Sequence, residues 1–345
     1  MRVLSLAAFA VVPAGVVAWG AAGHEIVGTI AQIYLLPSAK SNVCAILGMP
    51  FETCTLAPAA TWADRIKSIP SYRWANVLHY VNPLGDHPSQ TCTFGDEGWA
   101  GRQGMNVLGG IRNTTDFLLE GRPGAAEALK FLIHFLGDLH MPLHLTGREK
   151  GGNGVKVHFG RRSTNLHSVW DGLLIAKAIR ETPQNYTRPL PSRRVEGALN
   201  GAIYDSYIRQ IVWEGLLGRW QDDLVRWASC PTPAEPSIQQ SILQRLRLAG
   251  PPTDDEYVCP YAWAAEIHSL NCEIVWPAQL DEDKVGPDAP ELLELDEPWY
   301  SGRIRKEFLV ERLLATAGIR LAAVLNDIYA DRDDLKSLTP LLDLA

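Results

Sequence analysis

The sequence has no excess of basic residues: 32 Lys and Arg stand against 39 Asp and Glu in 345 residues, a formal net charge of -7. This balance excludes a protein that holds nucleic acid on a broad basic surface, so any polyanion must be attracted at one local site. The sequence also lacks a G-x-S-x-G nucleophile motif, an H-E-x-x-H zinc motif and a glycine-rich loop ending in Gly-Lys-Ser/Thr. The signatures of serine esterases, one class of zinc peptidases and P-loop proteins are therefore absent.

Long apolar runs are also missing, with one exception at the start of the chain. Residues 1–18 combine Arg2, an apolar run and small residues at Val16 and Ala18. This pattern predicts a secretory signal peptide that is cleaved before Trp19. The alternative is a membrane anchor, but the run is short for a bilayer span and contains Pro13. We therefore expect a secreted, extracellular protein of residues 19–345 with no membrane segment.

Strand-like alternation is scarce, and residues 155–159 give the best case. Apolar residues recur with helical spacing over most of the remaining chain. The sequence predicts a mainly α-helical single domain with long loops, whose helices lie at 22–36, 104–120, 125–140, 166–180, 196–228, 261–276 and 303–330. Between them, residues 181–194 are expected to form an exposed loop. The acid-rich residues 278–298 are interpreted as a solvated insertion or, alternatively, as a binding element for a cation or partner.

All six cysteines lie after the predicted cleavage site, which predicts up to three disulfides in an oxidising compartment. Only the pair Cys44–Cys54 can be assigned, because a ten-residue loop closes at low entropic cost. The pairing of the other four stays open: Cys92, Cys230, Cys259 and Cys272. Asn113 and Asn185 begin N-x-Thr sequons, which predict glycosylation on exposed loops.

Histidines recur near aspartates at helical spacing. His134 and Asp138 are four residues apart, and His167 and Asp171 repeat that spacing. Four residues turn about 400° along a helix, so each pair projects from one face and can bind a common ion. His144 lies between the pairs, and Asp64 and His79 lie upstream. Imidazole and carboxylate ligands without thiolates suit a catalytic zinc site, although each residue alone could be a buried core residue or a helix cap.

Several longer segments carry a resemblance to a known family. They are Trp19–His24, Trp62–Lys67, His134–His144, Gly151–Gly154 with Asn165–Asp171, and the late segment from Gly318 to Asp327. In order and spacing they resemble the zinc-dependent nuclease family typified by the fungal single-strand-specific nucleases. This similarity extends over nearly the whole chain after residue 18, and it implies the helical fold shared with zinc-dependent phospholipases C.

The resemblance implies a site for three Zn²⁺ ions with nine ligand residues. One zinc would bind Asp64, His79, His134 and Asp138; a second would bind His24, the bridging Asp138 and the terminal amine and carbonyl oxygen of Trp19; the third would bind His144, His167 and Asp171. The amine of Trp19 exists only after cleavage behind Ala18. Secretion and activation would therefore be a single event.

The implied activity is endonucleolytic hydrolysis of single-stranded DNA and RNA to 5′-mononucleotides, with removal of 3′-phosphate from 3′-nucleotides. Asp64 is expected to orient the attacking water, and Lys67 to stabilise charge on the phosphoryl oxygens. Tyr80 stands where the family offers an aromatic face to a base, and Asn82 where fungal relatives often carry Asp. His140 is expected to have a structural or supporting role.

The sequence leaves two other functions open. A zinc-dependent phospholipase C would share the fold and the N-terminal Trp ligand, but Asp171 stands where the phospholipases carry Glu. A non-catalytic secreted zinc-binding protein would keep the fold without turnover. Neither reading requires a protein partner, and the sequence indicates none.

Overall fold

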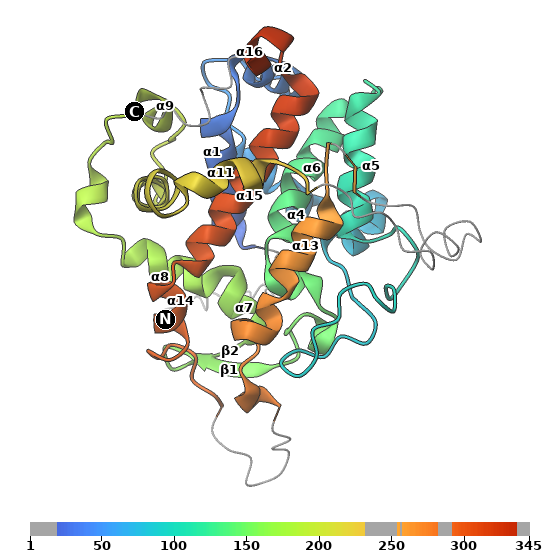
Figure 1. The fold of residues 1–345 in the computed structure, drawn as a ribbon, viewed down its shortest axis with the longest axis vertical. Helices are drawn as coiled ribbons and strands as arrows, with labels where there is room; N and C mark the ends of the chain where they lie inside the picture. Colours follow the sequence, from blue (N-terminus) through green and yellow to red (C-terminus); the bar gives the residue numbers. More distant parts are fainter. Residues whose placement is uncertain (1–18, 232–253, 256, 282–291, 337–345) are drawn as a thin grey trace, which may run out of the picture.

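The computed structural model describes residues 19–231, 254–255, 257–281 and 292–336 (Figure 1). The predicted signal peptide at residues 1–18 therefore lies outside the described residues. Helices dominate, and the one sheet among the described residues has two short strands. The prediction of a mainly α-helical fold is confirmed.

The described α-helices are α1 (Ala21–Tyr34), α2 (Pro37–Leu47), α3 (Ala57–Ala60), α4 (Trp62–Ile66), α5 (Val107–Leu119), α6 (Ala125–Leu139), α7 (Leu166–Ser168), α8 (Leu174–Arg180), α9 (Arg193–Glu196), α10 (Asp205–Gln210), α11 (Leu224–Ala228), α13 (Pro260–His268), α14 (Ser301–Lys306), α15 (Leu309–Tyr329) and α16 (Arg332–Lys336). Shorter 3₁₀ helices are η1 (Pro70–His79), η2 (Pro142–Leu145), η3 (Arg148–Lys150), η5 (Gln184–Thr187), η7 (Gln221–Asp223) and η9 (Ala278–Leu280). Three π-helical segments are η4 (Val169–Leu173), η6 (Ile211–Arg219) and η8 (Asn271–Val275). Strand β1 (Lys156–Phe159) pairs antiparallel with β2 (Arg162–Asn165).

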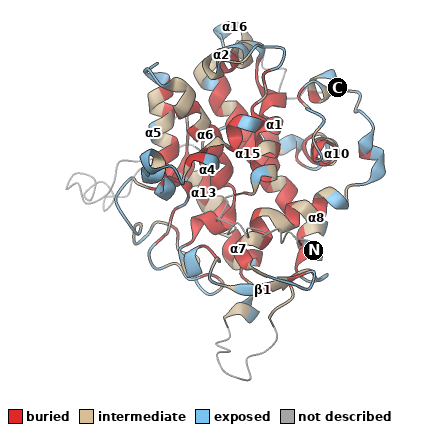
Figure 2. Cartoon of the chain, turned by 180° about the vertical axis from the view of Figure 1, so that it is seen from behind, coloured by how far each residue is buried: buried red, intermediate tan, exposed pale blue. Residues whose placement is uncertain are grey.

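The long helix α15 packs against α1 in the middle of the molecule (Figures 1 and 2). A Cβ at Gly318 would lie 2.5 Å from Cγ2 of Ile30, so only glycine permits this close approach of the two helices. The Asn326 side chain accepts from the Leu36 amide at 2.8 Å and donates to the Tyr34 carbonyl at 3.0 Å. These bonds satisfy backbone groups left unpaired where α1 ends.

Helix α6 lies against α5 and also contacts α1, α3, α4 and α15. Its residues from Phe131 to Leu139 are all buried, because the helix has neighbours on every side. Polar side chains on such a helix need a partner or a ligand. This makes the two polar residues of its last turns, His134 and Asp138, unusual.

Several predicted helices prove to be interrupted. The prediction of one helix over 196–228 is wrong between α9 and α10, where Gly201 has a φ of 74° and ends helical continuation. The helix predicted over 303–330 is divided into α14 and α15 by Phe308, which adopts a left-handed φ of 60°. The predicted exposed loop at 181–194 contains η5 and part of α9, and its Tyr186 is buried. No helix among the described residues is long and apolar enough to span a bilayer.

Three disulfides join Cys44 to Cys54, Cys92 to Cys272 and Cys230 to Cys259. The predicted Cys44–Cys54 pairing is confirmed, and the structure supplies the other two pairs. Both sequon asparagines are exposed. However, Asn113 lies within α5 and Asn185 within η5, so neither is on the irregular loop that was expected.

The acidic segment 278–298 is described only at its two ends. Its Asp281 accepts hydrogen bonds from Ser89 and Arg148, and its Asp296 pairs with Lys177. The Glu294 carboxylate accepts from the backbone amides of Gly160 and Arg161. The ends are thus bound to the body of the protein, and residues 282–291 lie outside the described residues.

Candidate metal centre

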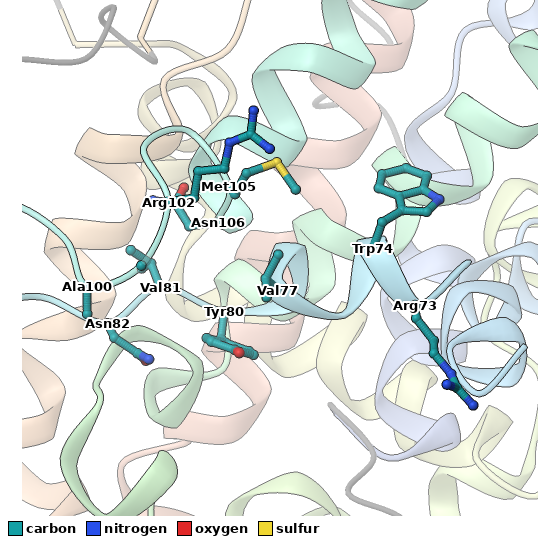
Figure 3. A pocket seen from close by; sticks show the side chains of 11 residues that line it. Arg73, Trp74, Val77, Tyr80, Val81, Asn82, Ala100, Arg102, Met105 and Asn106 are labelled. Carbon is teal, nitrogen blue, oxygen red and sulfur yellow. The ribbon is translucent and has the colours of Figure 1, made fainter. Parts of the chain in front are cut away.

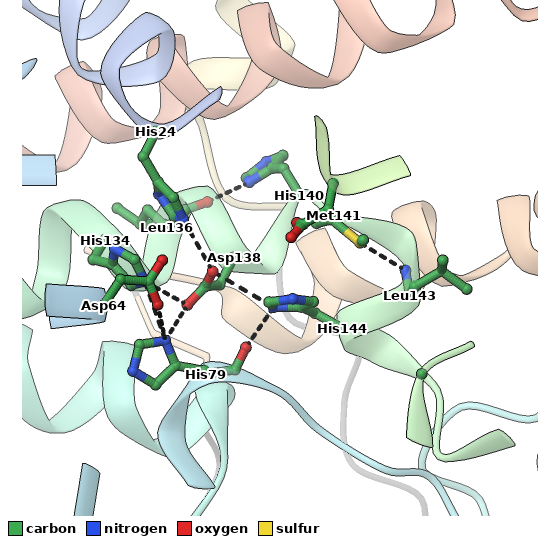
Figure 4. A network of polar contacts seen from close by, with 12 residues as sticks. His24, Asp64, His79, His134, Leu136, Asp138, His140, Met141, Leu143 and His144 are labelled. Atoms are coloured by element: carbon green, nitrogen blue, oxygen red, sulfur yellow. Dashed lines mark hydrogen bonds and ion pairs between the residues drawn. The ribbon is translucent and has the colours of Figure 1, made fainter. Parts of the chain in front are cut away.

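The last two turns of α6 bring His134 and Asp138 to one face, as the four-residue spacing predicts (Figure 4). The His134 Nε2 atom lies 3.2 Å from Oδ2 of Asp138, and both side chains are completely buried. The helix ends at Leu139, and its C-cap residue His140 directly precedes the Met141-Pro142 turn. This turn directs the following residues back across the same face.

Four imidazoles surround the Asp138 carboxylate. Its Oδ2 lies 2.9 Å from Nδ1 of His79 in addition to the His134 contact, and its Oδ1 lies 3.3 Å from Nε2 of His24 and 3.5 Å from Nδ1 of His144. The two carboxylate oxygens therefore face different pairs of histidines. This is the arrangement that a carboxylate bridging two cations requires.

His24 reaches this cluster from α1 because α6 has a glycine beneath it. A Cβ at Gly137 would lie 2.6 Å from Nδ1 of His24. The His24 and His134 rings consequently stack with centroids 3.8 Å apart. A larger residue at position 137 would displace His24 from the centre of the cluster.

Asp64 enters the cluster from the short helix α4. Its Oδ1 lies 3.7 Å from Nε2 of His134 and 3.9 Å from Nδ1 of His79. The same oxygen accepts a hydrogen bond of 2.9 Å from Nζ of Lys67, whose side chain is 28% exposed. Lys67 therefore connects the buried cluster to solvent at its outer edge.

A second group of potential ligands consists of His144, His167 and Asp171. His144 follows α6 in η2, and the other two lie on the continuous turn of α7 and η4. The His144 and His167 rings are nearly parallel, with centroids 5.3 Å apart. The Nε2 atom of His167 lies 3.9 Å from Oδ2 of Asp171, so the second predicted His–Asp pair also faces one point.

Backbone carbonyls orient three of the imidazoles. The Nδ1 atoms of His134, His144 and His167 lie 2.6–2.7 Å from the carbonyl oxygens of Ala60, His79 and Gly151, respectively. When Nδ1–H donates to a carbonyl, the lone pair of Nε2 is available for a metal. The backbone thus sets the tautomer that a metal ligand needs.

Several buried polar atoms of the cluster have no hydrogen-bond partner: Nε2 of His24, His79 and His167, and one oxygen each of Asp138 and Asp171. Burying such atoms without a partner costs free energy. A divalent cation coordinated by them would remove that cost. The donor set of imidazole nitrogens and carboxylate oxygens is also the one that zinc accepts.

Burial raises the pKa of Asp171 well above its ordinary value, and the charges of Asp64 and Asp138 add to this effect. Burial lowers the pKa of His144 to about 3 and also lowers that of His24. Burial also acts on His134, but the facing charges of Asp138 and Asp64 outweigh it and raise the pKa of His134. The pKa of Asp138 is held well below its ordinary value, against the effect of burial, by the histidines around it. A bound cation would take the place of the protons that His134 and Asp171 hold in its absence.

The N-terminal end of the described chain lies against this region. Trp19 is completely buried, and the next amide, of Gly20, donates a hydrogen bond of 2.6 Å to the backbone carbonyl of Asp171. The first described residue is thus tied to the segment that carries His167 and Asp171. All nine residues predicted as ligands lie in this part of the molecule.

Other histidines have different surroundings. Both ring nitrogens of His140 are occupied, one by the Leu136 carbonyl and the other by Arg320 of α15 at 2.9 Å. His268 lies 3.0 Å from Asp86 and close to Cys92, but the disulfide to Cys272 removes that sulfur as a thiolate ligand. Neither location matches the cluster around Asp138 as a metal site.

A groove of about 410 Å³ begins beside the cluster at Tyr80 and Asn82 (Figure 3). Tyr80 follows the cluster residue His79 directly and is 40% exposed. At the other end the groove is lined by Arg73 and Trp74, which the sequence patterns did not single out. The only available signal was their position on the segment that leads to His79.

Comparison with known proteins agrees with the family resemblance of the sequence. Residues 19–330 match the model of the family described as S1/P1 Nuclease. Endonuclease 2 of Arabidopsis thaliana is 29% identical over 320 residues, which cover 90% of each chain. Nuclease P1 of Penicillium citrinum is 28% identical over 315 residues, covering 90% of this chain and 98% of the relative. Nuclease S1 of Aspergillus oryzae is 39% identical over 155 residues, covering 44% and 53%. Since the family match spans most of the chain, the protein belongs to the S1/P1 nuclease family and is an enzyme that hydrolyses nucleic acid.

Proposed function

We propose that this nuclease is a secreted, zinc-dependent endonuclease for single-stranded DNA and RNA, which releases 5′-mononucleotides and also removes 3′-phosphate from nucleotides. The observation that carries this proposal is the convergence of buried imidazoles on both oxygens of Asp138. Such a convergence has no role in a purely structural core, because it leaves buried polar atoms without partners.

Three Zn²⁺ ions would be held by nine residues. Asp64, His79, His134 and Asp138 would bind the first, and His24, Asp138 and the backbone of Trp19 the second. His144, His167 and Asp171 would bind the third, in agreement with their grouping in space. The first and second ions would share Asp138. Its Oδ2 faces His134 of the first ligand set, and its Oδ1 faces His24 of the second.

When bound, zinc supplies the Lewis acidity that makes water nucleophilic near neutral pH and stabilises charge on a phosphate. The protein's own residues position the reactants. Asp64 would accept a hydrogen bond from the attacking water and so direct it toward phosphorus. Lys67, held 2.9 Å from Asp64 and partly exposed, would donate to a phosphoryl oxygen as negative charge develops there.

Preference for single strands would follow from the entrance beside the cluster. Tyr80 exposes 40% of its surface next to His79, which suits stacking on an unpaired base. Asn82 offers both a donor and an acceptor to a base edge, so base selectivity is expected to be weak. A base stacked within a duplex could not make these contacts.

Secretion would complete the site. The family match begins at Trp19, the residue predicted to follow signal cleavage. Cleavage would convert the Trp19 amide nitrogen into an amine, which can bind zinc. The three disulfides fit an oxidising compartment. We also propose that the exposed Asn113 and Asn185 carry glycans.

The test uses the protein purified from the medium of a secreting host. N-terminal sequencing should give Trp19, metal analysis should give three zinc ions per chain, and denatured DNA and RNA should be cleaved much faster than duplex DNA. A matched form that retains Ala18 before Trp19 should be strongly impaired. Full zinc content without cleavage of either nucleic acid would instead indicate a non-catalytic zinc protein, and hydrolysis of phosphatidylcholine vesicles alone would indicate a phospholipase C.

A further inference from the structure

The groove beside Tyr80 extends well past the residues expected to hold one base. Figure 3 shows Asn82 at one end and Arg73 with Trp74 at the other, with Tyr80 between them. Its volume of about 410 Å³ is in the range of small-ligand sites. We call the part formed by Arg73, Trp74, Val77, Arg102 and Met105 the Trp74 groove.

Trp74 is an unusual residue for a surface position. It is 53% exposed, yet its ring is held against Phe131 of α6 with centroids 5.7 Å apart. Phe131 in turn stacks on Phe135, whose ring contacts that of His79. The exposed indole is therefore supported by a row of rings that leads to the candidate metal centre. A fixed, half-exposed aromatic ring is the feature on which nucleobases stack in single-strand binding proteins.

The charges lining the Trp74 groove differ from those of the whole chain. The groove is lined by the exposed cations Arg73 and Arg102 and by no acidic residue, although acids outnumber bases in the sequence. Neither guanidinium takes part in an ion pair within the described part of the chain. A polyanion could therefore approach here without displacing an acidic partner.

The Trp74 groove also lies close to the candidate centre along the chain. Trp74 and His79 lie on the same 3₁₀ helix, η1, whose rise of roughly 2 Å per residue separates them by about 10 Å. That distance corresponds to about three steps of a stacked strand at ~3.4 Å per nucleotide. The far wall is fixed by backbone bonds: Val107 donates to the Tyr80 carbonyl at 3.0 Å and Ala100 to that of Asn82 at 2.9 Å.

We propose that the Trp74 groove is a subsite for the substrate strand beyond the scissile phosphate, with a base stacked on Trp74 and neighbouring phosphates bound by Arg73 and Arg102. This inference rests on the proposed single-strand nuclease function. The enzyme would thereby favour oligonucleotides over dinucleotides, because only the longer strand reaches Trp74.

The first experiment compares Trp74→Ala with the wild type on a dinucleotide and on an eight-residue single-stranded oligonucleotide. Loss of one base stack should lower kcat/KM for the oligonucleotide by roughly 5-fold or more. The dinucleotide should be cleaved at the wild-type rate within about 2-fold. Trp213→Ala is the matched control, because Trp213 is 48% exposed in η6 and does not line the groove.

Equal losses on both substrates, or no loss on either, would overturn the subsite. A wild-type enzyme that cleaves neither substrate would instead contradict the proposed nuclease function, so the two failures are distinguishable. If Trp74→Ala is poorly folded by circular dichroism, Arg102→Ala replaces it in the same comparison.

A second experiment measures binding of a phosphorothioate oligonucleotide to the zinc-loaded protein at increasing salt. Removing one phosphate contact by Arg73→Ala or Arg102→Ala should reduce the slope of log affinity against log salt by about 0.7. Lys336→Ala, at the exposed end of α16, should leave the slope unchanged. Unchanged slopes for both arginine variants would show that the groove does not bind the strand, and would favour a protein partner for its apolar part.

Discussion

Replacing Asp138 by asparagine tests the central feature of the proposed metal centre. The substitution keeps the size of the side chain but removes its negative charge and turns one acceptor oxygen into a donor. Asp138 is completely buried and has imidazole nitrogens within 3.5 Å of both oxygens. The amide cannot serve four such neighbours or bridge two cations.

The expected effects are large. Removing one charged partner from a buried polar network costs about 3–5 kcal/mol of stability. Substituting a residue that only hydrogen-bonds to a metal ligand already weakens metal binding ~10–100-fold. Loss of a ligand shared by two ions should weaken binding by more than this. We expect Asp138→Asn to retain at most the zinc of the His144 group and to lose more than about 99% of its activity on denatured DNA.

The assay measures zinc per chain by mass spectrometry after dialysis, together with nucleotide release. Asp205→Asn is the control, because Asp205 is also buried and accepts from the Gly201 and Ala202 amides at 2.8 and 3.1 Å without contacting the cluster. This control should lose stability but keep its zinc. Full activity of Asp138→Asn with fewer than three zinc ions would refute the bridging role.

Three further predictions concern catalysis, pH and packing. Lys67→Ala should lower kcat about 100- to 1,000-fold with unchanged zinc content, as expected when one donor to a developing oxyanion is removed, and single-turnover kinetics would measure it. In the metal-free protein, the folded-state pKa of His144 is lowered from 6.5 to about 3 by burial, so the unfolded chain binds the extra proton in that window. His144 therefore contributes to the free energy of unfolding a part that is fully present above pH 6.5 and is lost by about 1.4 kcal/mol per pH unit below it, and His144→Gln should remove this part of the slope in denaturant titrations. Asn326→Ala should lower the free energy of unfolding by about 1–3 kcal/mol, because the Leu36 amide and the Tyr34 carbonyl lose their partner; an unchanged denaturation midpoint would contradict this.

The helical elements nearest the candidate centre were predictable from sequence. The apolar periodicity at 22–36 and 125–140 corresponds to α1 and α6, within one or two residues at their ends. The four-residue spacing of His134 and Asp138 then placed both side chains on one face. A regular helix converts sequence spacing directly into position, which is why this part of the site is predictable from the sequence.

Irregular segments were not predictable in the same way. The left-handed conformation of Phe308 is unusual for an aromatic residue and gives no local signal. The 3₁₀ helix η1 holds Trp74 outward and Leu78 inward, and its apolar residues do not reveal which are exposed. Tertiary packing decides that distinction.

The cysteine pairs show the same limit. A ten-residue separation favours the Cys44–Cys54 pair through its low loop-closure entropy, whereas Cys92 and Cys272 are 180 residues apart. Their pairing depends on α13 and η8 lying beside the loop that follows Pro83. Only the folded arrangement brings these segments together.

The contact between α1 and α15 has a consequence for dissecting this enzyme. Every proposed ligand lies between residues 19 and 171, which suggests that the first half of the chain could work as a minimal catalytic fragment. However, Arg320 of α15 holds His140 two residues after Asp138, and Gly318 packs against Ile30 of α1, the helix that carries His24. A truncated chain that stops before Leu309 would leave the apolar side of α1 in water and would aggregate instead of assembling its centre.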